Sequence, residues 1–213
     1  IIPPSVTLLG KSAFQNCSSL TKIIIPSSVE MIEDNCFEGC SSLQKIEIPP
    51  SVKTIGENCF RSCSKLTEIT IDPYQTRIKN NSFENCFSLK DLILDQSIKT
   101  TSKLPKEITQ NIKRIIIPKS VTTLGDSTFA FIETLVEIEI PSSVNTIGRN
   151  CFEGCSSIPE IIIPPSVTLL GKGSFLNCTS LSKVTIAASI ATISDLSFEG
   201  CMSLKQITIP ESV

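Results

Sequence analysis

The chain has 213 residues, 40 % of which are apolar, and a formal net charge of −2. This slightly acidic balance argues against a general nucleic-acid-binding protein. No apolar run approaches the roughly 18 residues that a transmembrane helix requires, whereas the apolar fraction is large enough to bury a long core.

One unit of 23 residues is repeated along almost the whole chain. Twenty-two of its residues read SVEMIEDNCFEGCSSLQKIEIP from Ser28 to Pro49, and they return with the same spacing as SVNTIGRNCFEGCSSIPEIIIP. A period of this length predicts a solenoid, in which each coil packs only on its neighbours. The clearest marker is a phenylalanine that recurs at multiples of 23: Phe14, Phe37, Phe60, Phe83, Phe129, Phe152, Phe175 and Phe198.

The first part of each unit leads up to its phenylalanine. The pattern SVxxI, as in Ser28 to Ile32, predicts a short extended segment. A short helical turn should follow and end near Phe. Two residues after Phe, six units carry Asn or Gly, the types that tolerate the left-handed conformation at a helix end. These residues are Asn16, Gly39, Asn85, Gly154, Asn177 and Gly200.

The second part of each unit predicts a strand. In the pattern LxxIxI, as in Leu43, Ile46 and Ile48, the aliphatic residues at the end occupy every second position, and many of them are β-branched. Pro usually follows and stops the strand, because it cannot donate to the ladder. A serine then recurs at the corner, where its hydroxyl can bond backbone groups. The corner serines are Ser5, Ser28, Ser51, Ser97, Ser120, Ser143, Ser166, Ser189 and Ser212.

The combined pattern, LxxIxIPxSVxxIGxxxFxxCxxL, resembles the BspA-like (bacterial surface antigen type) class of leucine-rich repeats over essentially all residues. The resemblance implies a leucine-rich repeat solenoid (α/β, mainly β) of about nine coils. It further implies a right-handed, curved solenoid with a parallel β-sheet on the concave face, and short helical or 3-10 turns and short second strands elsewhere. Cell-surface recognition or adhesion is the function that the resemblance implies.

We expect a single leucine-rich repeat domain over residues 1–213. Both ends fall inside a unit, so we expect a fragment of a longer protein, and a signal peptide or anchor can lie outside it.

One unit, residues 95–117, is degenerate, because Lys106 stands where Phe is expected. Drift in a tolerant coil explains this, and so does a partner contact or hinge. The surrounding window is basic, which fits an acidic partner or merely a solvated face. Its charged residues are Lys99, Lys103, Lys106, Lys113, Arg114 and Lys119, against Glu107 alone.

The ten cysteines are locked to the repeat. Seven lie three residues after Phe and three lie just before it. Three interpretations remain: buried free thiols in a narrow column, disulfides such as Cys36 with Cys40, and a metal site. The chain has no His and no CxxC pair, which argues against the metal site.

The remaining motifs give little chemistry. Three glycosylation sequons, at Asn16, Asn80 and Asn177, are explained either by turn structure or by secretion from a eukaryotic cell. A nucleophile would lack its usual His base, and no glycine loop for phosphate is present. We therefore predict a protein that is not an enzyme and binds no cofactor or metal.

Two positions of each strand should face outward, eight and ten residues after Phe, and we call these positions the outward ladder. The first set is Lys22, Lys45, Glu68, Asp91, Arg114, Glu137, Glu160, Lys183 and Gln206. The second set is Ile24, Glu47, Thr70, Ile93, Ile116, Glu139, Ile162, Thr185 and Thr208. These positions vary in sign and polarity, as a surface freed from packing does.

The candidate partner-binding residues come from this ladder. Ile93 and Ile116, beside Arg114, predict an apolar patch with a charged rim. The other interpretation is that an outward Ile simply favours strand formation. The full candidate set is Ile93, Ile116, Arg114, Asp91, Glu137, Glu139, Lys45, Glu47 and Glu68.

The leading hypothesis is a non-catalytic recognition or adhesion module, secreted or at the cell surface. It would bind host or neighbouring-cell proteins or glycans through the concave sheet. The alternative is an intracellular, cytoplasmic scaffold or structural spacer that uses the same surface. Both hypotheses exclude nucleic acid as a partner and membrane insertion within this chain, and both leave the oligomeric state open.

Overall fold

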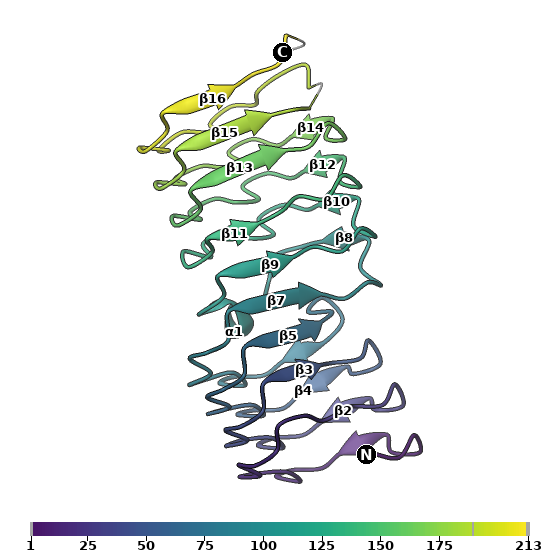
Figure 1. Cartoon of the computed structure of the whole chain (residues 1–213). Coiled ribbons are helices and arrows are strands. Elements are labelled where there is room, and N and C mark those ends of the chain that lie inside the picture. The colour runs from purple at the N-terminus through teal and green to yellow at the C-terminus, as the bar shows by residue number, and fades with distance from the viewer. Residues whose placement is uncertain (1, 189, 212–213) are drawn as a thin grey trace. The chain divides into compact units, whose positions relative to one another are not determined.

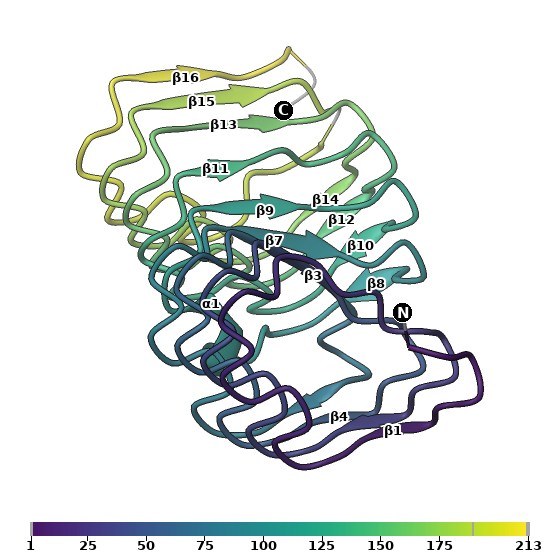
Figure 2. The ribbon, with the colours of Figure 1, turned by 60° about the horizontal axis from the view of Figure 1, so that its bottom comes forward.

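The structure, a computed structural model, describes residues 2–188 and 190–211 and forms a β-solenoid of short parallel strands (Figure 1). The parallel-sheet solenoid predicted from the repeat is therefore confirmed. In unit 1, defined below, Figure 2 shows β3 and β4 on opposite sides of the coils. We call the side of the LxxIxI strands the first side and that of the SVxxI strands the second side.

In each unit, each side carries one strand from most coils. The first side of unit 1 holds β3 (Lys45–Glu47), β5 (Glu68–Ile71) and β7 (Asp91–Leu94), and that of unit 2 holds β9 (Arg114–Ile116), β11 (Glu137–Ile138), β13 (Glu160–Ile163), β15 (Lys183–Ile186) and β16 (Gln206–Thr208). The second side of unit 1 holds β1 (Leu8–Leu9), β2 (Met31–Ile32), β4 (Thr54–Ile55) and β6 (Arg77–Ile78), and that of unit 2 holds β8 (Thr100–Thr101), β10 (Thr123–Leu124), β12 (Thr146–Ile147) and β14 (Leu169–Leu170). The predicted strand at residues 20–25 is not formed.

The chain divides into two compact units. Unit 1 comprises residues 1–95 and 105–112, and unit 2 comprises residues 96–104 and 113–213. Unit 1 has the strand orders β3-β5-β7 and β1-β2-β4-β6. Unit 2 has β9-β11, β13-β15-β16 and β8-β10-β12-β14. The division falls in the degenerate coil, and the expectation of a single domain stays a prediction.

The core of each unit is a set of ladders between the two sides. Strands pair residue by residue at a separation of 23, as Glu68 does with Asp91. Neighbouring phenylalanine rings have centroids 5.0 to 5.4 Å apart and are stacked, except for the tilted pair Phe129 and Phe152, and Phe37 and Phe60 are fully buried. A buried aromatic removes a large apolar area from water, so the stack stabilises neighbouring coils mutually.

The phenylalanine segments form consecutive turns, so the expected short helix is absent from them. The six Asn and Gly residues predicted to be left-handed are confirmed, with φ between 58° and 73°. A second left-handed residue, two positions before Phe, interrupts any helix there. These second residues are Ser12, Asn35, Asn58, Asn81, Ser127, Asn150, Gly173 and Leu196.

The turns also tie one coil to the next. The Asn35 N–H donates to the Glu57 carbonyl at 2.9 Å, and the Phe37 N–H donates to the Cys59 carbonyl at 2.8 Å. These bonds satisfy buried backbone donors without strand pairing. The left-handed positions that make these coil-to-coil bonds favour Asn and Gly, the residue types that adopt this conformation at low cost.

The degenerate coil replaces the turn with α1 (Lys106–Thr109), the one helix among the described residues. Ile108 and Leu104 are 2 % and 6 % exposed, so both are buried where the phenylalanine is missing from the sequence. The coil thus keeps apolar side chains inside despite losing its marker residue.

The corner hydroxyls act as predicted in part of the solenoid. Ser28 donates to the Val6 carbonyl at 2.7 Å, and at the irregular corner Thr76 donates to the Val52 carbonyl at 2.8 Å. Tyr74 occupies the usual serine position there, so Thr76 takes over the bond. Within the described residues the hydroxyls of Ser51, Ser120 and Ser166 are buried without a partner, and Ser189 and Ser212 lie outside the described residues.

A proline splits the first side of unit 2. Seven residues after Phe, the N–H normally donates to the same position of the preceding coil, as Thr67 does to Gln44 at 2.8 Å. Pro159 occupies this position and has no N–H to offer to Val136. The sheet of β9 and β11 ends there, and β13 begins a separate sheet.

All ten cysteines are free thiols, and the suggested Cys36–Cys40 disulfide is wrong. Most are buried, although Cys17 is exposed and Cys201 is half-buried. Cysteines three residues after Phe donate to the Phe carbonyl of the preceding coil, as Cys63 does to Phe37 at 3.2 Å. Their small size and weak S–H donor suit this narrow column.

Candidate interaction surface

The outward ladder lies on the first side and is open to solvent. Every one of its residues is exposed or half-buried, while the residues between them on the same strands are largely buried. β5 shows the alternation clearly, since Glu68 and Thr70 are half-buried and Ile69 and Ile71 are buried. The predicted orientation is therefore correct, and the role of these residues in binding stays a proposal.

In unit 1 the ladder carries opposite charges on neighbouring strands. Lys45 on β3 pairs with Glu68 on β5, with 2.9 Å between Nζ and Oε2. Glu47 follows Lys45 on the same outward face and is exposed, and Asp91 on β7 is half-buried. The surface is therefore mixed in charge rather than uniformly acidic.

The same part of unit 1 contains a hollow of about 690 Å³. Its walls come from residues 21–25 of the first coil, from β3 with its flanks, and from Glu68 and Thr70. Pockets of a few hundred Å³ with apolar walls and a few polar groups are typical of binding sites.

Unit 2 carries a second hollow of about 330 Å³ on the first side. Ile116 on β9 is 39 % exposed and lines it together with Arg114 and Lys119. Glu137 lies 4.0 Å from Arg114, and Glu139 completes the rim. An apolar centre with a charged rim is the composition found at protein interfaces.

The nine candidate residues are distributed over both units. Lys45, Glu47, Glu68, Asp91 and Ile93 belong to unit 1, and Arg114, Ile116, Glu137 and Glu139 belong to unit 2. Ile93 is half-buried on β7. The predicted patch that combines Ile93 with Ile116 therefore stays a prediction, and each unit offers its own apolar centre.

The six basic residues of the degenerate window divide in the same way. Lys106 belongs to unit 1 and the other five to unit 2, and all the lysines among them are exposed.

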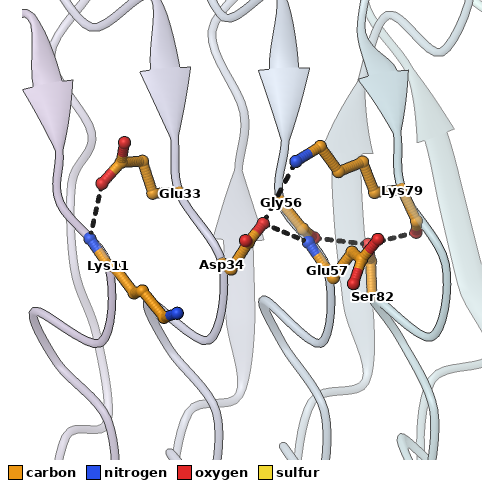
Figure 3. Close-up of polar contacts among 7 residues, drawn as sticks. All are labelled: Lys11, Glu33, Asp34, Gly56, Glu57, Lys79 and Ser82. Carbon is orange, nitrogen blue, oxygen red and sulfur yellow. Dashed lines mark hydrogen bonds and ion pairs between the residues drawn. The ribbon is translucent and has the colours of Figure 1, made fainter.

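The second side carries polar contacts that the sequence did not reveal (Figure 3). The carboxylate of Asp34 accepts the Glu57 N–H at 2.9 Å and the Lys79 ammonium at 3.2 Å. These bonds lower the pKa of Asp34, the bond from the Glu57 N–H most of all. Asp126 accepts the Arg149 N–H in the same way, at 2.7 Å, so Asp three residues before Phe is the signal that marks such a contact.

A glycine allows this close approach between coils. A Cβ at Gly56 would lie 2.4 Å from the Asp34 nitrogen, well inside van der Waals contact. Figure 3 shows Lys79 reaching past Gly56 and Glu57 to Asp34. These contacts connect the turns of neighbouring coils, and the Asp34 carboxylate has its hydrogen-bond partners within the protein.

Neither a membrane-spanning helix nor a metal-binding cluster occurs among the described residues. None of the described helices is long and apolar enough to cross a bilayer. Residues 2–188 and 190–211 also contain no group of three or more His, Cys, Asp or Glu side chains placed to hold a metal ion.

Comparison with known proteins identifies the family. The model of the BspA type leucine-rich repeat region matches residues 1–104 and 107–213 in six copies. No curated protein matches the chain.

Three solved structures are similar at 21 to 24 % identity. A leucine-rich repeat protein from Bacteroides ovatus is 24 % identical, with 100 % of this chain and 78 % of that chain covered and a TM-score of 0.49. A leucine-rich cell surface protein from Faecalibacterium prausnitzii is 24 % identical, with 96 % and 70 % covered and a TM-score of 0.44. The pneumococcal vaccine antigen PcpA is 21 % identical, with 98 % and 78 % covered and a TM-score of 0.40. The family match extends over nearly every residue, and the chain belongs to the BspA-type leucine-rich repeat family.

Proposed function

We propose that this chain is a non-catalytic recognition module at the cell surface, and that it binds proteins through the outward ladder of the first side. The ladder is the observation that carries the proposal. Its positions are all open to solvent and change between Lys, Glu, Asp, Thr and Ile from coil to coil. The buried positions of the same strands repeat their residue types, because packing restricts them.

The family supports the same proposal, since leucine-rich repeats offer a long surface that equivalent residues of many coils share. The Arg114–Ile116 region with its charged rim supplies an anchor in unit 2, and the hollow beside β3 supplies one in unit 1. Such binding would serve cell adhesion if the ligand is a protein on the surface of a host or neighbouring cell.

A binding panel tests this proposal. Extracellular-matrix proteins, cell-surface proteins and a glycan array are probed with the wild-type chain and with the double variant Ile93→Asp/Ile116→Asp. Burying a charge in an apolar interface is costly, so we expect binding to a protein ligand to weaken at least about tenfold. The matched control is Leu8→Asp/Leu169→Asp, which places the same charges on the second side, where these leucines are 47 % and 55 % exposed.

Unchanged binding of the first double variant to every ligand would refute the role of the ladder. Selective binding on the glycan array would replace the protein ligand with a glycan. Location is tested separately, by treating intact producing cells with protease. Digestion of the chain is expected for a surface module, and full protection would favour an intracellular scaffold.

A further inference from the structure

The first side of unit 1 contains an unpaired strand edge. β3 pairs with β5, with Lys45 opposite Glu68 and Glu47 opposite Thr70. On its other edge lie residues 22–26 of the first coil, which form no strand. In the described part of the chain a single backbone bond joins the coils here, from the Gln44 N–H to the Thr21 carbonyl at 3.4 Å. No substitution in the first coil explains why the pairing stops after this bond.

The direction of the backbone groups follows from the bonds to β5. The Ile48 N–H donates to the Thr70 carbonyl at 2.8 Å, so Ile48 faces β5. Residues two apart in a strand face the same edge, so Ile46 does the same. The N–H and C=O groups of Lys45 and Glu47 therefore point toward the first coil. Among the described residues, no residue of the first coil bonds to them.

The hollow of about 690 Å³ gives these groups room for a ligand. Its walls include Ile23 and Ile24 from the first coil and Ile46 from β3. Ile24 is 68 % exposed, so its apolar side chain is open to a ligand. The volume lies within the range of natural ligand pockets.

Four charged side chains line the hollow, two of each sign. Lys45 and Glu68 pair with each other, with 2.9 Å between Nζ and Oε2. Lys22 and Glu47, both exposed, border the hollow from the first coil and from β3. The site thus combines backbone donors and acceptors, apolar side chains and two charges of each sign.

We infer that the free edge of β3 binds an extended segment of a partner protein as an added strand. A strand edge with unpaired N–H and C=O groups is a template for another chain, and strand addition is an established mode of peptide recognition. The segment would carry β-branched apolar residues at alternate positions, which contact the exposed Ile24 and the half-buried Ile23. The inference rests on the proposed function, because it specifies the kind of partner that the first side recognises.

A peptide probe with a matched control tests this inference. The probe is a blocked seven-residue peptide of alternating valine and threonine, and the control is the same peptide with alternate amides N-methylated. N-methylation removes the hydrogen-bond donors of one edge and leaves the side chains intact. We expect the probe to bind and the control to bind at least about tenfold more weakly, since hydrogen bonds to the edge give the affinity.

Amide hydrogen exchange locates the bound peptide. In the free chain the amides of Lys45 and Glu47 should exchange at least about tenfold faster than those of Ile46 and Ile48. Saturating peptide should slow Lys45 and Glu47 by at least about tenfold and leave Ile46 and Ile48 little changed.

A pair of protein variants completes the test. Ile24→Asp should weaken peptide binding at least about tenfold, because it puts a charge among the apolar side chains of the site. Ile162→Asp is the control, since Ile162 occupies the same ladder position in unit 2 and is 62 % exposed.

Three results would overturn the inference. Slow exchange of Lys45 and Glu47 in the free chain would mean that residues 22–26 close the edge. Equal binding of both peptides, or none below about 1 mM, would exclude strand addition. An equal loss of binding in Ile162→Asp would place the peptide elsewhere. Each result leaves the Ile93→Asp/Ile116→Asp panel unaffected, so failure of this inference is distinct from failure of the proposed function.

Discussion

At the scale of single residues, cysteine shows how a conspicuous motif is explained by packing. Burial raises the pKa of Cys36 to about 12 and that of Cys40 to about 11, because the thiolate cannot be solvated inside the solenoid. Since the thiolate is the reactive form, these thiols are protected both by low ionisation and by lack of access.

Alkylation measures this protection. In a short pulse of iodoacetamide at pH 8, we expect rapid labelling of the exposed Cys17 and slower labelling of the half-buried Cys201. The other eight thiols should react only after denaturation, and mass spectrometry of the digested chain gives the label at each site. Comparable labelling of Cys63 and Cys17 in the folded chain would contradict the packing of the cysteine column.

Asp34 gives a prediction for pH. Its pKa is lowered in the folded state by the Glu57 N–H and by Lys79. Asp34 therefore stabilises the fold above its unfolded pKa of about 3.9, and this contribution is lost as pH falls through the lower folded value. The free energy of unfolding of wild type should exceed that of Asp34→Asn at pH 7, and the difference should shrink below about pH 4.

Urea unfolding of both proteins over this pH range gives the comparison. Glu153→Gln serves as a control for loss of one carboxylate, because no salt bridge or side-chain hydrogen bond holds Glu153 within the described residues. A difference between wild type and Asp34→Asn that is independent of pH would show that the ionised carboxylate plays no part.

At the scale of elements, the hydrogen-bond ladder decides where sheets begin and end. Pro159 removes one donor and coincides with the break between β11 and β13. Thr occupies the same position in the first and third coils, as Thr21 and Thr67. Pro159→Thr should restore the bond to Val136 and extend the pairing, so the amides of residues 160–162 should exchange at least about tenfold more slowly.

The net change in unfolding free energy for Pro159→Thr should be small, within about 1 kcal/mol. The new hydrogen bonds stabilise the fold, and the loss of the proline adds conformational entropy to the unfolded chain. Pro141→Thr is a suitable comparison, because Pro141 follows the strand segment and a threonine there would restore no bond of this ladder. Unchanged exchange at 160–162 would mean that the break has another cause.

The sequence predicted the elements well where a position repeats in type. Phe37 and its equivalents, the strands such as β5, and the left-handed Gly39 all follow from the pattern. The expected helix failed because Asn35 and Asn58, visible in the sequence, mark a second left-handed position that ends it. Features that occur once in the described residues, such as the contact of Asp34 with Lys79 two coils away, lack any periodic signal.

The sequence predicted which side chains of the candidate surface face outward, but not which strand edge is unpaired. Alternation in LxxIxI places Glu68 outward and Ile69 inward, and the structure agrees. The open edge of β3 was not predictable, since the first coil has the same strand pattern as the others. Strand pairing depends on the fit between two whole coils, so it cannot be predicted from the residue types of one coil.

At the scale of the whole molecule, the central claim is that the outward ladder of the first side binds a partner protein. The most direct measurement compares two double charge reversals, using a ligand found in the panel. Glu137→Lys/Glu139→Lys changes the ladder, and Glu133→Lys/Glu153→Lys makes the same change in net charge away from it. Both are measured at about 0.15 M salt, where charge effects beyond roughly 8 Å are screened. We predict that the ladder variant changes Kd at least about tenfold and the control less than about twofold, whereas an equal or larger effect of the control would contradict the claim.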